Sequence, residues 1–114
     1  MTIKEVIVEN IHGEKFVLNV FLNLASIRAI EKELKQMDKS YNFYNCLPMI
    51  DKGELSITLA YICNCVHLEG KKAPLGSDFF DNHDINFLNY SAELISALAQ
   101  CLTDNKSGVE SKGK

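Results

Sequence analysis

The side chains in this sequence that could act as nucleophiles, bases or metal ligands are four cysteines and three histidines. The cysteines are Cys46, Cys63, Cys65 and Cys101, and Cys63, Cys65 and His67 alternate along one apolar segment. On a helix, residues two apart point about 200° away from each other, so these three side chains cannot close on one metal ion. No feature directs the chain to an oxidising compartment, where disulfides form. We therefore expect four thiols that pack as small apolar groups, without a metal ion or a disulfide.

The histidines are scattered along the chain. His12 falls in a predicted turn, and His67 lies near a predicted helix end, where the helix dipole favours it as a cap. His83 lies beside Asp81 and Asp84, and this trio is either a weak cation site or an ordinary acidic helix start. A Cys–His nucleophilic pair remains an alternative, because the sequence does not show which side chains the fold brings together. Because the sequence contains no phosphate-binding, nucleophile-elbow or zinc-protease motif, we expect no enzymatic activity and no cofactor.

The composition is that of an ordinary globular domain. The chain has 114 residues, is 46% hydrophobic and 24% charged, and has a net charge of -3. Nucleic-acid binding needs a basic face, which the isolated pair Lys71 and Lys72 does not supply. Tyr41, Phe43 and Tyr44 fit a core or an interface better than base stacking. Without a long apolar run or a signal peptide, the sequence predicts a cytoplasmic protein that binds neither nucleic acid nor membrane.

The hydrophobic periodicity and the turn residues predict an α+β domain, with an N-terminal β-hairpin packed on a bundle of about four helices. Residues 3–22 are expected to form the hairpin, because two β-branched runs flank a glycine-containing turn. A hairpin alone is marginal in water, so it must pack on the helical body predicted over residues 24–102. In that body, Asn23 is the expected N-cap of a helix over 24–38.

Further helices are predicted along the rest of this body. A helix over 42–50 is kept short by its proline. The segment 54–67 is apolar on nearly all sides, which predicts a central or interface helix. Ser77 begins a short helix, and Asp84 is the expected N-cap of the last helix, which runs to residue 102. The inner stripe of that last helix is expected to consist of Ile85, Leu88, Ala92, Ile95, Ala99 and Leu102.

A single domain is expected over residues 1–102. In the segment that follows, Val109 is the only large apolar side chain. Such a segment buries too little surface to offset the entropy lost on ordering the chain. We therefore predict a disordered polar tail over residues 103–114.

The sequence has more large apolar side chains than a small bundle must bury. Exposed apolar patches mark partner-binding sites, so this surplus favours an interaction protein over an enzyme. The edge of the hairpin is also a template for pairing with another chain, and we expect a homo-oligomer formed through the hairpin or through the apolar helix. The candidate partner-binding residues are Phe79, Phe80, Leu55, Leu59 and Ile62.

Over residues 20–102, the order of elements resembles the short tail assembly chaperones of long-tailed phages and prophages. The resembling stretches are VFLNLASIRAIEKELKQM, LPMIDKGELSITLAYICNCV and APLGSDFFDNHDINFLNYSAELISALAQCL. In that family, a helix with an R-x-I-E type surface precedes an acidic-Gly turn, an apolar helix, a Pro-containing loop and a final helix. The matching positions are Arg28, Ile30 and Glu31 for the first feature, Asp51, Gly53 and Glu54 for the second, and Pro74 for the loop.

The resemblance implies a non-enzymatic protein of the bacterial host cytosol. It would bind the tape measure protein, keep the long apolar helices of that client in solution and help to recruit tail tube subunits. It would be absent from the finished virion, and the family often makes a second, longer product by a translational frameshift. The alternative function is another small interaction adaptor, such as an antitoxin-like or regulatory module.

Overall fold

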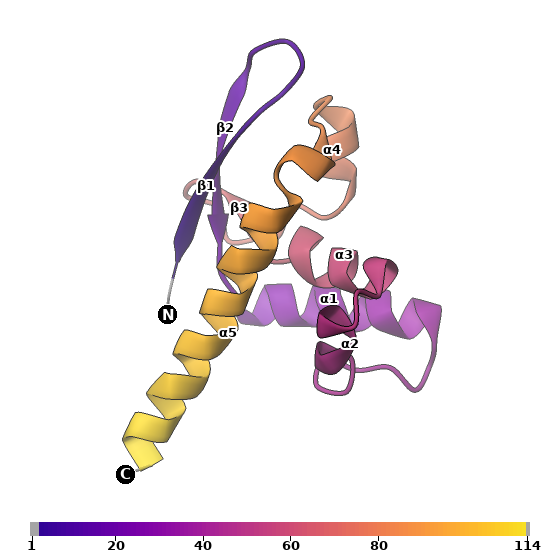
Figure 1. Cartoon of the computed structure of the whole chain (residues 1–114), viewed down its shortest axis with the longest axis vertical. Helices are drawn as coiled ribbons and strands as arrows, with labels where there is room; N and C mark the ends of the chain where they lie inside the picture. Colours follow the sequence, from indigo (N-terminus) through magenta and orange to yellow (C-terminus); the bar gives the residue numbers. More distant parts are fainter. Residues whose placement is uncertain (1–2, 114) are drawn as a thin grey trace.

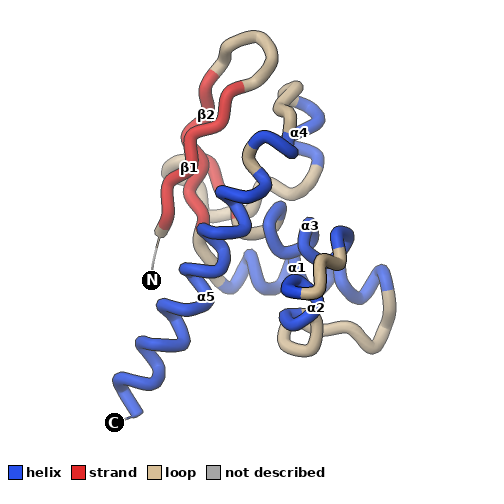
Figure 2. Tube along the Cα trace, viewed as in Figure 1, coloured by secondary structure: helices blue, strands red, loops and turns tan. Residues whose placement is uncertain are grey.

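The computed structural model describes residues 3–113, with side chains described for residues 3–103. Three antiparallel strands form one sheet in the order β1-β2-β3. Figure 2 shows the strands in red. The strands are β1 (Lys4–Glu9), β2 (Lys15–Val20) and β3 (Val66–Leu68). The helical segments are α1 (Leu24–Met37), α2 (Leu47–Asp51), α3 (Leu55–Cys63), α4 (Asp78–Asn82), the 3-10 turn η1 (Phe87–Asn89) and α5 (Ser91–Gly113). The predicted α+β class is confirmed.

Helix α5 lies diagonally across one face of the sheet, while α1, α2 and α3 gather at the end away from the hairpin turn (Figure 1). Helix α5 packs against β1 and β2, and α3 contacts α1, α2 and α5. The hydrophobic core therefore lies between the inner face of the sheet and these helices. Its largest fully buried apolar side chains include Tyr61, Leu18, Ile30, Leu34, Ile62, Leu94 and Leu98.

The hairpin over residues 3–22 forms as predicted, with Val6 opposite Leu18 and Val8 opposite Phe16. Strand alternation sends Val6, Val8 and Leu18 into the core. The turn is closed by the side chain of Asn10, whose Oδ1 accepts the backbone N–H groups of His12 and Glu14 at 2.9 Å. The sequence therefore identified the hairpin correctly.

Helix α1 is also confirmed, because it covers Leu24–Met37 and begins at the predicted N-cap. Asn23 Oδ1 accepts the backbone N–H of Ser26 at 2.8 Å, which satisfies one of the unpaired donors at the helix start. Ile30 and Leu34 are buried on one face of the helix, as their helical spacing predicts.

The predicted helix over 54–67 is wrong beyond residue 63. Helix α3 ends at Cys63, and the side-chain Nδ2 of Asn64 donates to the carbonyl of Ala60 at 2.8 Å. The next residues turn back, and Val66–Leu68 pairs with β2, with Val66 opposite Val20. A segment buried on every side has no periodicity that separates helix from strand, which is why the third strand was missed.

The last helix begins later than predicted. Asp84 is no N-cap: it has a φ of 57° and precedes the 3-10 turn η1, which is capped by the side chain of Asn86. Helix α5 begins at Ser91. A short polar residue such as Asp tolerates the left-handed backbone and can end a helix as well as begin one.

Helix α5 is continued through Gly113, over a segment that the sequence predicts to be a disordered tail from residue 103. The side chains of residues 104–114 lie outside the described residues, so the packing part of that prediction stays a prediction. In the described part of the chain, no helix is long and apolar enough to cross a membrane.

Candidate functional site

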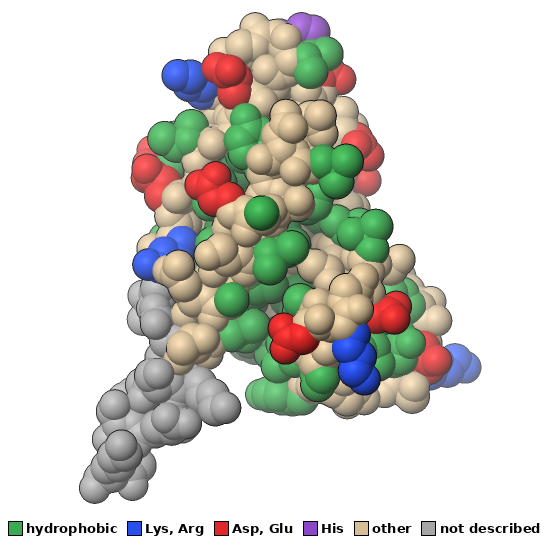
Figure 3. All heavy atoms as spheres, viewed as in Figure 1, with side chains coloured by type: hydrophobic (Ala, Val, Ile, Leu, Met, Phe, Trp, Pro, Cys, Tyr) green, Lys and Arg blue, Asp and Glu red, His purple; other side chains and the backbone are tan. Residues whose placement is uncertain are grey.

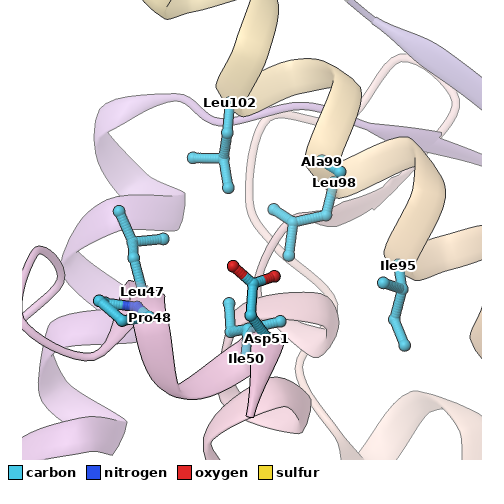
Figure 4. A pocket seen from close by; sticks show the side chains of 8 residues that line it. All are labelled: Leu47, Pro48, Ile50, Asp51, Ile95, Leu98, Ala99 and Leu102. Atoms are coloured by element: carbon cyan, nitrogen blue, oxygen red, sulfur yellow. The ribbon is translucent and has the colours of Figure 1, made fainter. Parts of the chain in front are cut away.

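An apolar groove lies between α2 and α5, with a volume of about 360 Å³. In the space-filling view, hydrophobic side chains gather along this junction (Figure 3). Figure 4 shows that α2 and α5 send side chains toward each other across the groove. The groove is lined by Leu47, Pro48, Ile50, Asp51, Ile95, Leu98, Ala99 and Leu102.

The two walls of the groove follow from local sequence. Pro48 sits in the first turn of α2, where the missing N–H breaks no helical hydrogen bond. Gly53, with a φ of 80°, turns the chain directly after α2 and keeps that wall short. On α5, Ile95, Ala99 and Leu102 recur at intervals of four and three residues, so they lie along one side of the helix.

Helix α5 carries two apolar stripes on different sides. The stripe that enters the core consists of Leu94, Leu98 and Cys101, which are buried. Of the predicted inner stripe, Ile85 is buried in the core as expected. The other members face the groove or solvent at least in part, because Ile95 is 38% exposed, Leu88 is 79% exposed and Leu102 is only partly buried. The prediction placed the core face of the helix one residue out of register, because both stripes have helical spacing. A second stripe beside a complete core stripe is the sequence signal that would have found the groove.

Among the residues with described side chains, one charged group lines this apolar groove. Asp51 ends α2, and its carboxylate is directed between the two helices (Figure 4). A carboxylate next to apolar walls attracts a cationic group that arrives with apolar neighbours. The groove can therefore accept the apolar face of a helix that also carries Lys or Arg.

The predicted partner-binding residues do not form one surface. Leu55 is 67% exposed at the start of α3, Leu59 is partly buried, and Ile62 is completely buried. Leu59 lines a separate hollow together with Phe80 and Phe87. The prediction stays open for Leu55 and Leu59, whereas Ile62 is core.

Phe79 and Phe80 are also core residues, 7% and 2% exposed, and their predicted role in binding a partner stays a prediction. The Phe79 ring meets Phe16 edge-on at 5.5 Å, and the Phe80 ring meets Phe87 edge-on at 5.0 Å. These aromatic contacts anchor the short helix α4 against β2 and η1. Short helices need such anchors, because a single turn has little stability of its own.

His67 is completely buried and lies on β3, not at a helix end as predicted. Its Nε2 lies 3.0 Å from Ser26 Oγ, its Nδ1 lies 3.3 Å from the carbonyl oxygen of Asn19, and its ring stacks on Phe21 with a centroid distance of 3.8 Å. Burial lowers the pKa of His67, because the charged imidazolium is poorly solvated there. The side chain joins the start of α1 to the sheet.

The other two histidines are held in separate contacts. His12 Nε2 lies 3.0 Å from Asp84 Oδ2, which ties the hairpin turn to the segment after α4. His83 Nδ1 donates to the carbonyl of Phe79 at 2.9 Å. The predicted trio of His83, Asp81 and Asp84 is thus divided between two contacts, and no cluster of three or more metal-binding side chains occurs among the residues with described side chains.

No family model, curated protein or solved structure matches this chain.

All four cysteines are buried thiols, as predicted. Burial raises the pKa of the Cys63 thiol to about 12, and it also raises the pKa of Cys65 and of Cys46. Cys101 Sγ donates to the carbonyl of Val20 at 3.4 Å. Because the thiolate is the reactive form, Cys46, Cys63 and Cys65 are poor nucleophiles in the folded protein.

Thiol titration checks this assignment. Unfolded, non-reduced protein is expected to show four titratable thiols, whereas the folded protein should react at least about tenfold more slowly because its thiols are buried. A count of zero in the unfolded protein would mean a disulfide framework. Fast reaction of the folded protein would mean that the thiols are accessible.

Proposed function

We propose that this protein is a tail assembly chaperone of a long-tailed phage or prophage, acting without catalysis in the host cytosol. In this role it binds the tape measure protein and assists assembly of the tail tube. The observation that carries the proposal is the groove between α2 and α5, with its apolar walls and the carboxylate of Asp51. The acidic-Gly turn of the resemblance begins at Asp51, which lines that groove.

The groove suits a client helix for physical reasons. A long apolar helix exposed before assembly aggregates unless its apolar stripe is covered. Ile95, Ala99 and Leu102 present an apolar surface that buries such a stripe without a catalytic group. Because Asp51 lies at the groove, the favoured client segment carries a Lys or Arg close to its apolar residues.

Non-enzymatic action also agrees with the placement of the reactive side chains. His67 and Ser26 are buried and link α1 to the sheet, while burial raises the pKa of Cys63 and Cys65. These groups serve packing in the described part of the chain. The accessible apolar surface at the groove is therefore the feature left to carry function.

Groove variants test the proposal. Ile95→Glu places a second carboxylate among the apolar walls. We expect binding of a tape measure fragment to weaken by about tenfold or more, because the apolar stripe of the client would have to cover and desolvate this charge. The matched control is Leu88→Glu, an exposed position outside the groove, which should bind within about twofold of wild type. Co-purification of the client and its soluble fraction on co-expression are the measurements.

Two outcomes would contradict the proposal. The tape measure protein would be equally soluble with and without this protein, or Ile95→Glu and Leu88→Glu would bind it equally well. If the groove instead bound a helix of an unrelated cytosolic protein, the adaptor alternative would replace the chaperone function. Far-UV circular dichroism of both variants controls for unfolding.

A further inference from the structure

A second surface lies away from the groove, at the outer edge of β1. The sheet order β1-β2-β3 leaves β1 with a neighbouring strand on one side only. At the opposite edge, the backbone N–H of Leu75 donates to the carbonyl of Val66 at 2.9 Å, which covers β3 there. Alternate residues of β1 turn their backbone groups toward β2 or toward the outer edge. The edge of β1 is therefore the place where another strand can add.

At the C-terminal end of β1, the backbone groups of this edge already have hydrogen-bond partners within the protein. The hydroxyl of Tyr90 accepts the backbone N–H of Glu9 at 2.9 Å and lies 3.2 Å from its carbonyl oxygen. The backbone N–H of Ile11 donates to the carbonyl of Asp84 at 3.2 Å. These contacts also show that the odd-numbered residues of β1 are those whose backbone N–H and C=O groups point to the outer edge of the sheet. They limit strand addition to the residues before Glu9.

The near half of the edge is open. In the part of the chain that the structure describes, the outward backbone groups of Glu5 and Ile7 have no hydrogen-bond partner. A hollow of about 160 Å³ between this half of β1 and α5 leaves room beside the strand. On the outer face of the sheet, Ile3 and Ile7 are 56% and 53% exposed. Backbone donors, acceptors and apolar side chains thus coincide over residues 3–7.

We propose that β1 pairs antiparallel with β1 of a second copy of this chain, about a two-fold axis at Val6. In this register, Glu5 lies opposite Ile7 of the second copy, and Ile7 lies opposite Glu5. The two pairs are related by symmetry, as a closed dimer requires. The two sheets then become one continuous sheet, and the four outward-facing backbone groups of each open edge are satisfied.

Charge selects this register over its neighbours. Sliding the second strand by two residues in one direction places Glu5 opposite Glu5, and sliding it the other way places Glu5 opposite Glu9. Like charges directly opposite each other destabilise a strand pair. The second slide also demands the backbone groups of Glu9, which Tyr90 already holds. The register centred on Val6 avoids both conflicts, and this complementarity of the strand with itself is why a second copy is the occupant.

Charge variants at one exposed position test the pairing. Ile7→Glu creates two Glu–Glu juxtapositions in each dimer, and Ile7→Lys creates two Glu–Lys pairs at the same positions. Wild-type protein is expected to form dimers as its concentration rises from micromolar to near-millimolar. Ile7→Glu should raise the dimer dissociation constant about tenfold or more, whereas Ile7→Lys should stay within about threefold of wild type. Sedimentation equilibrium measures all three.

Two further variants sharpen the result. Adding Glu5→Lys to Ile7→Glu restores an opposite-charge pair and should return the dimer. Ile95→Glu, in the groove, should leave dimerisation unchanged. The proposal is overturned if wild type stays monomeric, if the two Ile7 variants weaken the dimer equally, or if Ile95→Glu is the variant that abolishes it. Client binding is measured separately, so failure of the dimer leaves the proposed function standing.

Discussion

Replacing Phe80 with aspartate is expected to unfold the protein. The Phe80 ring is 2% exposed and lies against the rings of Phe79 and Phe87. Losing a buried phenylalanine costs about 3–5 kcal/mol, and an unpaired buried carboxylate adds a further penalty of several kcal/mol. Because a domain of this size is stable by only about 5–15 kcal/mol, the sum removes most or all of its stability.

Circular dichroism and thermal unfolding measure this effect. Phe80→Asp should lose the cooperative transition and most of its helical signal, while Leu88→Asp, at an exposed position, should change the free energy of unfolding by no more than about 0.5 kcal/mol. A Phe80→Asp protein that kept the wild-type transition and failed only to bind a client would place this ring at the surface. The burial of α4 would then be wrong.

Acid is expected to destabilise the protein through His67. Its pKa is lowered by burial, and its ring contacts the Ser26 hydroxyl, the Asn19 carbonyl and the Phe21 ring, which are all uncharged. Above about pH 6.5, the ordinary pKa of histidine, the neutral ring is present in both the folded and the unfolded chain. Below it, the unfolded chain takes up a proton that the folded protein resists. The free energy of unfolding therefore falls by up to about 1.4 kcal/mol per pH unit, until the pH reaches the lowered pKa of the folded state.

Urea unfolding at several pH values between about pH 5 and pH 7.5, the range in which histidines titrate, measures how the free energy of unfolding changes with pH. His67→Gln should be less stable at neutral pH, because it loses the buried ring, but its stability should depend less on pH. Wild-type protein measured over the same pH range is the reference for this slope. If His67→Gln kept the full wild-type slope, the buried His67 ring would not be the acid-sensitive group.

The sequence predicted those elements that carry their own local signal. The hairpin has β-branched runs on both sides of a turn, and α1 has an N-cap directly before an apolar stripe. The strand Val66–Leu68 carries no such signal, because its neighbours along the chain are also buried and only the pairing with β2 decides its conformation. Long-range pairing overrode a helical pattern that continued through residue 67.

The candidate site was harder to predict for a related reason. Apolar residue types do not indicate which of them the fold leaves accessible, so Phe79 and Phe80 were assigned to a surface although they fill the core. The groove depends on how α2 approaches α5, and this geometry is set by the turn after α2 and the packing of α3. Only the two stripes of α5 were visible in the sequence, and they were taken for one.

The contact between Tyr90 and Glu9 has a consequence for synthesis on the ribosome. These residues are 81 positions apart, and α5 is also the element that covers the inner face of β1. Contacts of such high sequence separation form late, because the intervening chain must close first. Until residues 90–102 emerge, the inner face of β1 lacks its cover by α5 and the edge of β1 is open over its full length. The nascent chain thus passes through a stage in which its first strands are exposed to other chains. At that stage, chaperones of the cell can bind these strands.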